Sequence, residues 1–309
     1  MVRPRWSVVV CDGLAEEGQA LLRAEAEVTE GASAAALRGA EALIVRSRTR
    51  VDAALLTRTP RLKVVGRAGA GVDSIDLDAA RAAGVIVVNA PEAVTEAAAE
   101  HALALMLALA RRIPTADAAL RRGKWIKSEL LGIELGGRTL GLVGFGRIGR
   151  ALGRKAAALG MRVLATSPSL DDATARAHGA ERAPLERLLA EADIVSLHVP
   201  LDESTRGLID RRALGRMKPG ALLISTARGG VVDEEALLEA LEQGRLAGAA
   251  LDVFATEPPG RSPLLEHPAV VATPHVAAQT VEAQRRAACD IATEILAALR
   301  GDPLRWRVA

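Results

Sequence analysis

Three polar residues in the second half of the sequence each follow a short apolar run, and their types suit acid–base chemistry on an anion. Arg228 follows "ALLISTA", Glu257 follows "LDVFAT" and His275 follows "VVATP". A carboxylate beside a histidine favours the imidazolium and gives a general acid–base pair. An arginine ending a buried run is costly unless an anion meets it, and its planar fork suits a carboxylate. The three residues therefore predict a site that binds a carboxylate and moves a proton.

A glycine-rich motif predicts a second kind of chemistry. In "TLGLVGFGRIGRALGRK" an apolar run is followed by Gly144-Phe145-Gly146-Arg147-Ile148-Gly149 and then by a helical pattern. The first glycine allows a tight turn, the second lets backbone approach a pyrophosphate, and the third permits close packing of helix on strand. Free N–H groups at the start of the helix favour the diphosphate. The motif predicts a bound dinucleotide.

The choice between NAD and NADP stays open at this stage. An acidic residue about 20 positions after such a motif normally binds the ribose hydroxyls and favours NAD. Ser167, in "ATSPS", holds that place, and no arginine follows until Arg176. A serine can bond a hydroxyl but does not repel a 2′-phosphate, and it is equally compatible with a plain turn. We therefore expect NAD, with NADP not excluded.

The elements that must position these residues alternate along the whole chain. Short β-branched runs, separated by Ala/Leu-rich helical segments, predict strands at 6–12, 42–47, 62–67, 85–91, 139–144, 161–167, 193–200, 221–226, 247–254 and 270–275. An apolar helix at 94–111, with a buried centre "ALALMLALA", and an irregular segment at 121–138 lie between the two blocks. A last helix runs from about 280 to 300 and ends before Gly301 and Pro303.

This alternation predicts an α/β protein with two doubly wound parallel-sheet domains. We expect a Rossmann dinucleotide-binding domain at 97–282, inserted in a flavodoxin-like substrate domain at 1–96 and 283–309, with a cleft between the two. Parallel sheets bind ligands at the carboxyl ends of their strands, which is where Arg228, Glu257 and His275 fall.

Composition excludes several other classes of protein. The 309 residues carry a net charge of +2 with both signs interspersed, so neither nucleic acid nor an anionic membrane is an expected partner. The run at 102–110 is too short to span a bilayer, and the first residues lack the long apolar run of a signal peptide. Two cysteines suggest neither a disulfide framework nor a metal site. A cytoplasmic enzyme without a metal is the expectation.

The order of "GFGRIG", "TARGG", "LDVFATEPP" and "PHVAAQT" resembles that of the D-2-hydroxyacid dehydrogenase family. The stretches "VRSRTRV", "GRAGAGVDSIDLDAA", "AAEHALALMLALAR" and "GKW" are similar to its phosphoglycerate dehydrogenase branch, and the match covers essentially the whole chain. The resemblance implies a homodimer that oxidises D-3-phosphoglycerate to 3-phosphohydroxypyruvate with NAD, in serine biosynthesis. The sequence stops where the family's catalytic core stops, so no C-terminal regulatory domain, and no serine inhibition through one, is expected.

Two other functions stay open. One is a reductase of glyoxylate or hydroxypyruvate, possibly NADP-linked, on the same scaffold. The other is a dinucleotide-sensing interaction protein, because transcriptional corepressors share this fold. The three catalytic residue types do not exclude the second possibility, but no partner-binding extension is evident.

The resemblance also implies a role for each site residue. His275 takes the hydroxyl proton of a 2-hydroxy acid, Glu257 orients His275, and Arg228 binds the carboxylate and the C2 oxygen. The dinucleotide is contacted, besides the glycine motif and Ser167, by Val199, Pro200, Thr226, Ala227, Asp252 and Ala278. Backbone N–H groups of Gly69, Ala70 and Gly71 supplement Arg228 as an anion nest.

Substrate choice is assigned to Arg46 and Arg67, each at the end of an apolar strand of the first domain. Two guanidinium groups suit a phosphate dianion, although charged strand ends are common in a chain with 40 basic residues. Val94 stands where the family often has asparagine, so one polar contact is expected to be missing. Lys127, close to Trp125, either reaches a neighbouring subunit's site or is a solvated surface lysine.

Overall fold

The computed structural model describes residues 6–309, which form two compact units. The first unit runs up to Thr95 and resumes with Ala278–Ala309; the second is Glu96–Ala277. The chain returns to the first unit at 278 rather than at the expected 283. Ala278 already packs beside the small apolar cluster of Ala90, Ala93, Val94 and Ala287, which belongs to that unit.

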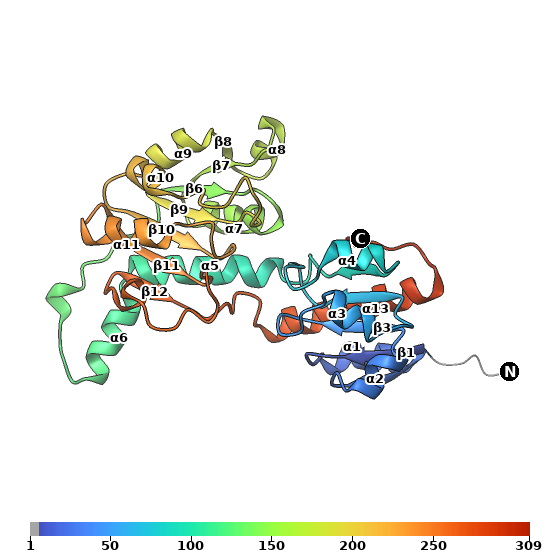
Figure 1. The fold of residues 1–309 in the computed structure, drawn as a ribbon. Coiled ribbons are helices and arrows are strands. Elements are labelled where there is room, and N and C mark those ends of the chain that lie inside the picture. The colour runs from blue at the N-terminus through green and yellow to red at the C-terminus, as the bar shows by residue number, and fades with distance from the viewer. Residues whose placement is uncertain (1–5) are drawn as a thin grey trace. The chain divides into compact units, whose positions relative to one another are not determined.

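The first unit is a five-stranded parallel sheet with the order β2-β1-β3-β4-β5, the order of flavodoxin-like folds. Its strands are β1 (Trp6–Val10), β2 (Ala26–Glu30), β3 (Ala42–Val45), β4 (Val64–Arg67) and β5 (Ile86–Asn89). Its helices are α1 (Glu16–Arg23), α2 (Ala34–Gly39), α3 (Ala53–Thr57), α4 (Leu77–Ala82) and α13 (Val281–Arg300) (Figure 1). One apolar core joins the sheet to α13, and a second lies on the side of α2, α3 and α4.

The long helix α13 lies very close to the sheet. A Cβ atom added at Gly66 of β4 would lie 2.8 Å from Ile291 and 2.9 Å from Ile295, both on α13. The approach therefore needs a glycine at this position. The expected end of the helix is confirmed, because Gly301 follows it in the left-handed conformation with φ 79°.

Strand β2 was not expected from the sequence. Its residues, Ala26–Glu30, are mostly polar and exposed because β2 lies at the edge of the sheet, and they directly follow α1. Neither alternation nor a run of apolar residues marks such a strand. Only its pairing with β1, in which Val8 lies opposite Val28, makes it a strand.

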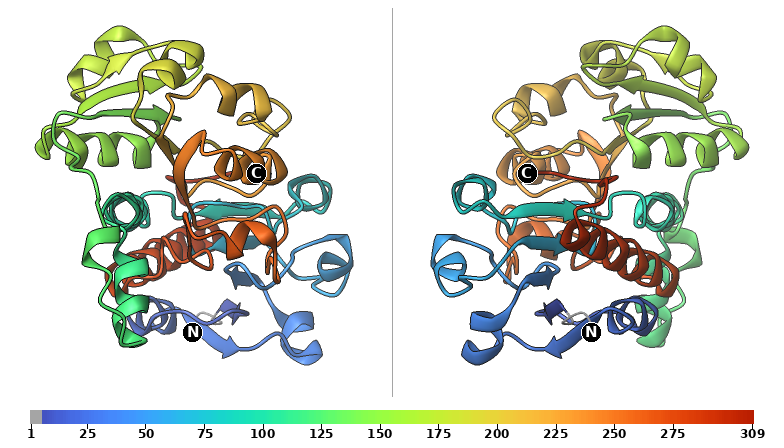
Figure 2. Two further views of the ribbon diagram at one scale, coloured as in Figure 1. Left: turned by 90° about the vertical axis from the view of Figure 1, so that its left-hand side faces the viewer. Right: turned by 90° about the vertical axis from the view of Figure 1, so that its right-hand side faces the viewer.

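The second unit is a seven-stranded parallel sheet with the order β12-β11-β10-β9-β6-β7-β8 (Figure 2). Its strands are β6 (Thr139–Val143), β7 (Arg162–Thr166), β8 (Glu181–Arg182), β9 (Ile194–Leu197), β10 (Ala221–Ser225), β11 (Leu246–Leu251) and β12 (Val270–Ala272). Its helices are α5 (Thr95–Ala110), α6 (Ile113–Arg121), α7 (Arg147–Ala158), α8 (Asp172–Ala177), α9 (Leu185–Glu191), α10 (Arg211–Arg216), α11 (Glu234–Glu242) and α12 (Pro263–Glu266), with a short 3₁₀ helix at Lys127–Glu129. A large apolar core covers each face of the sheet.

The strand register brings six strand ends to one edge of this sheet. Opposite positions are filled, in spatial order, by Ala272, Leu251, Ser225, Leu197, Val143 and Thr166, each the last residue of its strand. The loops that follow carry nearly all the residues predicted for the second unit's site. The parallel arrangement alone therefore gathers them at the edge where such sheets bind ligands.

Helix α5 is less buried than its composition suggested. Leu107 is 38% exposed, and Ala104 is exposed as well, so one side of the helix within "ALALMLALA" faces solvent in this chain. The expectation of a fully buried helix was wrong at these positions because a run of apolar residues does not show which side packs. Within residues 6–309, no helix combines the length and the apolar character that crossing a bilayer requires.

Candidate active site

His275 and Glu257 form a hydrogen-bonded pair at the carboxyl edge of the second sheet. His275 Nδ1 lies 2.8 Å from Glu257 Oε2, and both side chains are partly exposed, at 46% and 38%. The other carboxylate oxygen, Oε1, accepts a hydrogen bond from the backbone N–H of Phe254 at 3.1 Å. Glu257 is thus held from both sides, and its contact with Nδ1 leaves Nε2 for exchange of a proton with a ligand.

The backbone of the His275 loop is fixed by Asp252. Its carboxylate is fully buried and accepts hydrogen bonds from Val276 N–H at 2.9 Å, Ala277 N–H at 3.0 Å and the Thr273 hydroxyl at 2.6 Å. Its carbonyl accepts a further bond from His275 N–H at 2.8 Å. These bonds hold His275 in the left-handed conformation with φ 52°, which non-glycine residues seldom adopt.

His101, on α5, completes the support of this loop. Its Nε2 lies 3.0 Å from Thr273 Oγ1 and 3.3 Å from Asp252 Oδ1. Burial by itself would raise the pKa of Asp252, but the hydrogen bonds from His101, Thr273 and the loop backbone hold that pKa below its usual value. Asp252 was expected to contact the nicotinamide. In the structure its buried carboxylate bonds the loop that carries His275.

Arg228 lies in the loop after β10, which packs against the loop of Glu257. A Cβ atom at the neighbouring Gly229 would lie 1.7 Å from the carbonyl oxygen of Phe254, so only glycine allows this approach. Arg228 is partly buried, and its Nη1 donates to the carbonyl of Ala227 at 2.7 Å. Arg228, Glu257 and His275 therefore come from three loops at one edge: the loop of Arg228 meets that of Glu257 at Phe254, and His275 meets Glu257 through their hydrogen bond.

The surroundings of Gly144 and Gly149 fit the turn and packing roles that the sequence predicted for them. Gly144 has φ 96°, and a Cβ there would lie 2.5 Å from the carbonyl oxygen of His198. A Cβ at Gly149, on α7, would lie 2.3 Å from the carbonyl oxygen of Gly144. At Gly146, in contrast, no heavy atom of residues 6–309 lies within 4 Å of the added Cβ. The free space is at the glycine that was expected to face a pyrophosphate.

Other atoms along this edge also fit a dinucleotide. Gly146, the N-cap of α7, has no side chain to cap the helix, and the start of a helix is a favourable place for an anion. The hydroxyls of Ser225 and Thr226 are buried without a hydrogen-bond partner in the part of the chain that the structure describes. Buried polar atoms without partners are uncommon unless a ligand or water meets them.

Three further predicted cofactor residues follow strands that end at the same edge. Ser167 is partly exposed directly after β7, and Val199 and Pro200 follow β9 in the same way. His198, before them, has Nε2 at 2.9 Å from Ser196 Oγ, and burial lowers its pKa to about 4. A neutral, hydrogen-bonded imidazole at this position suits a structural role. Ala278, the last predicted residue, belongs to the first unit.

In the first unit, Arg46 and Arg67 lie at the ends of neighbouring strands. Val45, just before Arg46, lies opposite Arg67 in the register of β3 and β4. Arg67 lies over Gly69, where a Cβ would come within 1.5 Å of its Nη1. The N–H of Gly69 donates to the carbonyl of Arg67 at 2.8 Å, so Gly69 is not a donor of the predicted anion nest. Only Ala70 and Gly71 can supply donors there.

Asp12 is a site residue that the sequence analysis did not identify. Its buried carboxylate accepts hydrogen bonds from the N–H groups of Arg46 at 2.7 Å and Thr49 at 3.1 Å, and from the Thr49 hydroxyl at 2.7 Å. It thereby fixes the loop that presents Arg46. The signal in the sequence is an acidic residue at the end of β1, in "VVVCDG", where a charged residue needs partners if it is buried.

Val94 is buried among apolar residues, and Lys127 is exposed to solvent. Val94 is buried in the apolar cluster with Ala90 and Ala93, so an apolar side chain fits its surroundings. Lys127 begins the short 3₁₀ helix and is exposed, as is Trp125, 80% of whose surface is accessible.

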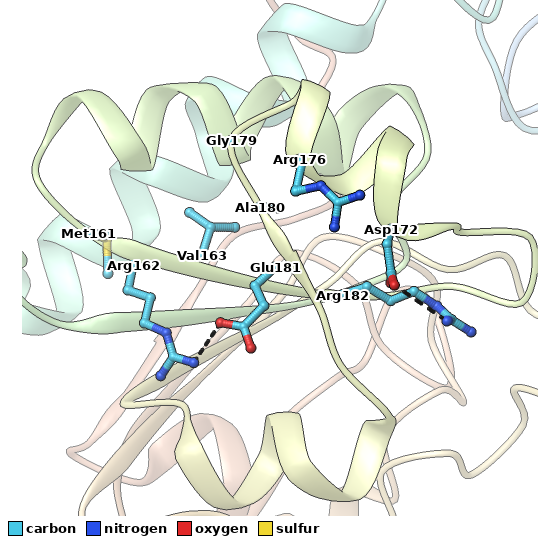
Figure 3. A pocket seen from close by; sticks show the side chains of 9 residues that line it. All are labelled: Met161, Arg162, Val163, Asp172, Arg176, Gly179, Ala180, Glu181 and Arg182. Carbon is cyan, nitrogen blue, oxygen red and sulfur yellow. Dashed lines mark hydrogen bonds and ion pairs between the residues drawn. The ribbon is translucent and has the colours of Figure 1, made fainter.

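A separate open pocket of about 580 Å³ lies between α8, β7 and β8, away from all of these residues (Figure 3). It is large enough for a small ligand. Two of its arginines are already paired, Arg162 with Glu181 at 2.7 Å and Arg182 with Asp172 at 3.7 Å. The lining also includes Arg176, so it carries three basic and two acidic side chains, and none of the predicted site residues is among them.

Comparison with known proteins agrees with this geometry. Residues 103–277 match the family model of the D-isomer specific 2-hydroxyacid dehydrogenase, NAD binding domain. The chain belongs to the D-isomer specific 2-hydroxyacid dehydrogenase family. The matched region holds the glycine motif, Arg228, Glu257 and His275, so these residues lie in the NAD-binding domain of this dehydrogenase family.

Individual relatives are similar to this chain over most of its length. D-3-phosphoglycerate dehydrogenase from Mycobacterium tuberculosis is 48% identical over 301 residues, which cover 96% of this chain and 57% of that protein. This chain thus spans little more than half of that relative. The crystal structure of TT0316 protein from Thermus thermophilus superposes with a TM-score of 0.87, and the two sequences are 40% identical. The match covers 98% of this chain and 99% of that one. A glyoxylate reductase from Paecilomyes thermophila is 30% identical with a TM-score of 0.88, covering 99% and 98%.

Proposed function

We propose that this protein oxidises D-3-phosphoglycerate to 3-phosphohydroxypyruvate, with NAD as the hydride acceptor, as the first step towards serine. The observation that carries the proposal is the His275–Glu257 pair at 2.8 Å on the same sheet edge as the open glycine motif. Phosphoglycerate dehydrogenases of 43–48% identity, which cover most of this chain, support the choice of substrate. We also propose that the enzyme acts as a cytoplasmic homodimer, as the family resemblance implies.

In the proposed mechanism the residues of the chain bind the substrate and move one proton. Arg228 binds the substrate carboxylate and the C2 oxygen through its planar guanidinium. His275 accepts the C2 hydroxyl proton at Nε2, and Glu257, bonded to Nδ1, stabilises the imidazolium that forms. Bound NAD supplies the acceptor for the hydride that leaves C2. Asp252 keeps the His275 loop in its strained conformation.

The same chain supplies two arginines for the phosphate of the substrate. Arg46 and Arg67 lie on adjacent strand ends, and their two fixed positive charges suit a dianion better than a neutral hydroxymethyl group. We assign the phosphate to this pair.

A reductase of glyoxylate or hydroxypyruvate is the second candidate. The similarity to a glyoxylate reductase over nearly the whole of both chains favours it. Ser167 after β7 would in that case also admit NADP, since it does not repel a 2′-phosphate.

Steady-state kinetics with D-3-phosphoglycerate and D-glycerate, each with NAD and NADP, test the proposal. We expect kcat/KM for the phosphorylated acid to exceed that for D-glycerate by about 100-fold, because two guanidinium groups bind the phosphate. Changing Arg46 and Arg67 to Gln should abolish most of this preference. Equal turnover of both acids by the wild type would favour the second candidate.

A further inference from the structure

Gln279 contacts one of the two arginines assigned to the substrate phosphate. Its Oε1 accepts a hydrogen bond from Arg46 Nη2 at 3.3 Å, within the first unit of the fold. Gln279 is exposed and directly precedes Thr280, the N-cap of α13. The two residues are 233 positions apart, so only the folded chain brings them together.

The backbone of Arg46 is fixed independently of Gln279. Its N–H donates to Asp12 at 2.7 Å, and its carbonyl accepts from the Ser74 hydroxyl at 3.3 Å. Burial lowers the pKa of the Arg46 guanidinium, while nearby Asp12 acts in the opposite direction, and an arginine remains charged at neutral pH in either case. The loop thus fixes the backbone from which the side chain extends, and Gln279 bonds the charged end of that side chain.

A carboxamide can orient an arginine without neutralising it. Its oxygen accepts from the guanidinium, and its NH₂ group can still donate to an anion. A carboxylate in the same place would form an ion pair with Arg46 and repel a phosphate. The 20-residue helix α13 begins immediately after Gln279 and Thr280, and the positive end of its dipole adds to the attraction for an anion.

Building on the proposed function, we propose that Gln279 is a specificity-determining residue of the phosphate subsite. It aligns the guanidinium of Arg46 and donates a hydrogen bond to a phosphate oxygen. Its neutrality keeps the positive charge of Arg46 available to the dianion. The expected ligand group is a phosphate monoester rather than a hydroxyl or a methyl group.

The test compares Gln279→Glu, Gln279→Ala and the control Gln243→Glu. Gln243 is an exposed residue that follows α11 in the second unit, so the control makes the same charge change away from Arg46. Each variant is assayed with D-3-phosphoglycerate and D-glycerate, and binding of inorganic phosphate is measured by calorimetry. Thermal unfolding confirms that each variant is folded.

We expect Gln279→Glu to lower kcat/KM for D-3-phosphoglycerate about 30-fold or more, and to weaken phosphate binding in step. Turnover of D-glycerate should change less than about 2-fold, and Gln279→Ala should lie between the wild type and Gln279→Glu. The control should behave as the wild type. Equal losses for both acids, or an unchanged constant for the phosphorylated acid, would overturn the inference while leaving the dehydrogenase intact.

Failure of the proposed function gives a different pattern. If the wild type shows no preference for the phosphorylated acid, the assignment of D-3-phosphoglycerate is rejected, and the phosphate titration decides the role of Gln279. Weaker phosphate binding in Gln279→Glu than in Gln243→Glu then supports the anion subsite. Equal binding, or none in the wild type, overturns it.

Discussion

At the scale of single residues, the chemistry depends on which atoms of the side chains meet. Histidine, glutamate and arginine were identified from their types and their places after strands, and the pairing of Glu257 with His275 was expected, but their backbone partners were not. The sequence does not show that Glu257 also accepts from Phe254 N–H, or that Asp252 holds the backbone around His275. Asp252 was assigned to the cofactor from the family resemblance, and its support of the His275 loop became visible only in the structure, where it is buried.

The charge of Glu257 is expected to matter more than its hydrogen bond. Gln at this position keeps an oxygen for His275 Nδ1 but cannot stabilise an imidazolium by charge. We expect Glu257→Gln to lower kcat about 10-fold to 100-fold, with an unchanged dissociation constant for NADH measured by fluorescence. An unaltered kcat would show that Glu257 has no part in proton transfer.

Arg228 should tolerate no other cation. Lysine keeps the positive charge but lacks the planar fork that binds a carboxylate through two parallel hydrogen bonds. Arg228→Lys is expected to lower kcat/KM for any 2-hydroxy acid about 100-fold, while NADH binding stays within about 2-fold. Full activity of the lysine variant would indicate that charge alone suffices there.

At the scale of elements, the glycine motif shows how one turn can serve both folding and binding. Gly144 and Gly149 are needed because protein atoms fill the space of a side chain, whereas the space beside Gly146 is open and is the place that we predict for the pyrophosphate. The three roles were predicted from the order of strand, motif and helix. The atoms that contact Gly144 could not be predicted, because they belong to His198, which is distant in the sequence.

This difference predicts opposite effects for two alanine substitutions. Gly146→Ala should leave the unfolding temperature within about 2 °C of the wild type but weaken NADH binding about 10-fold or more, because the methyl group occupies the pyrophosphate space. Gly149→Ala should destabilise the protein by about 2 kcal/mol or more, because its methyl group meets the Gly144 carbonyl. Gly215→Ala in α10, where a Cβ meets no atom within 4 Å among the described residues, is the control. The account of the motif fails if Gly146→Ala binds NADH normally.

At the scale of the whole molecule, the fold was predicted far better than its contacts. Ten apolar runs indicated ten of the twelve strands within residues 6–309, since buried parallel strands are apolar and helices separate them. The two missed strands, β2 and β8, are polar strands at sheet edges, which only their neighbours define. Asp12 and Gln279 were missed for a related reason. Each of them acts through its contact with Arg46, and no local sequence pattern indicates a contact between residues so far apart in the sequence.

His198 predicts how the stability of the molecule responds to acid. Its pKa is about 4 in the folded chain and about 6.5 when unfolded, so the unfolded chain binds more protons between these values. Stability is therefore complete above pH 6.5 and falls as the pH drops towards 4. Because His198 is only partly buried, we expect its protonation to lower the free energy of unfolding by about 2 kcal/mol. Urea unfolding of the wild type and His198→Gln at pH 7 and pH 4.5 should show a smaller loss in the variant, and equal losses would contradict the assignment.

The most direct test of the account is NADH formation from D-3-phosphoglycerate by the wild type and by His275→Asn. The account predicts NADH formation by the wild type, a loss of kcat of about 100-fold or more in the variant, and an unchanged dissociation constant for NADH. A wild type that binds NADH but oxidises no 2-hydroxy acid, or a variant that keeps its kcat, would contradict it.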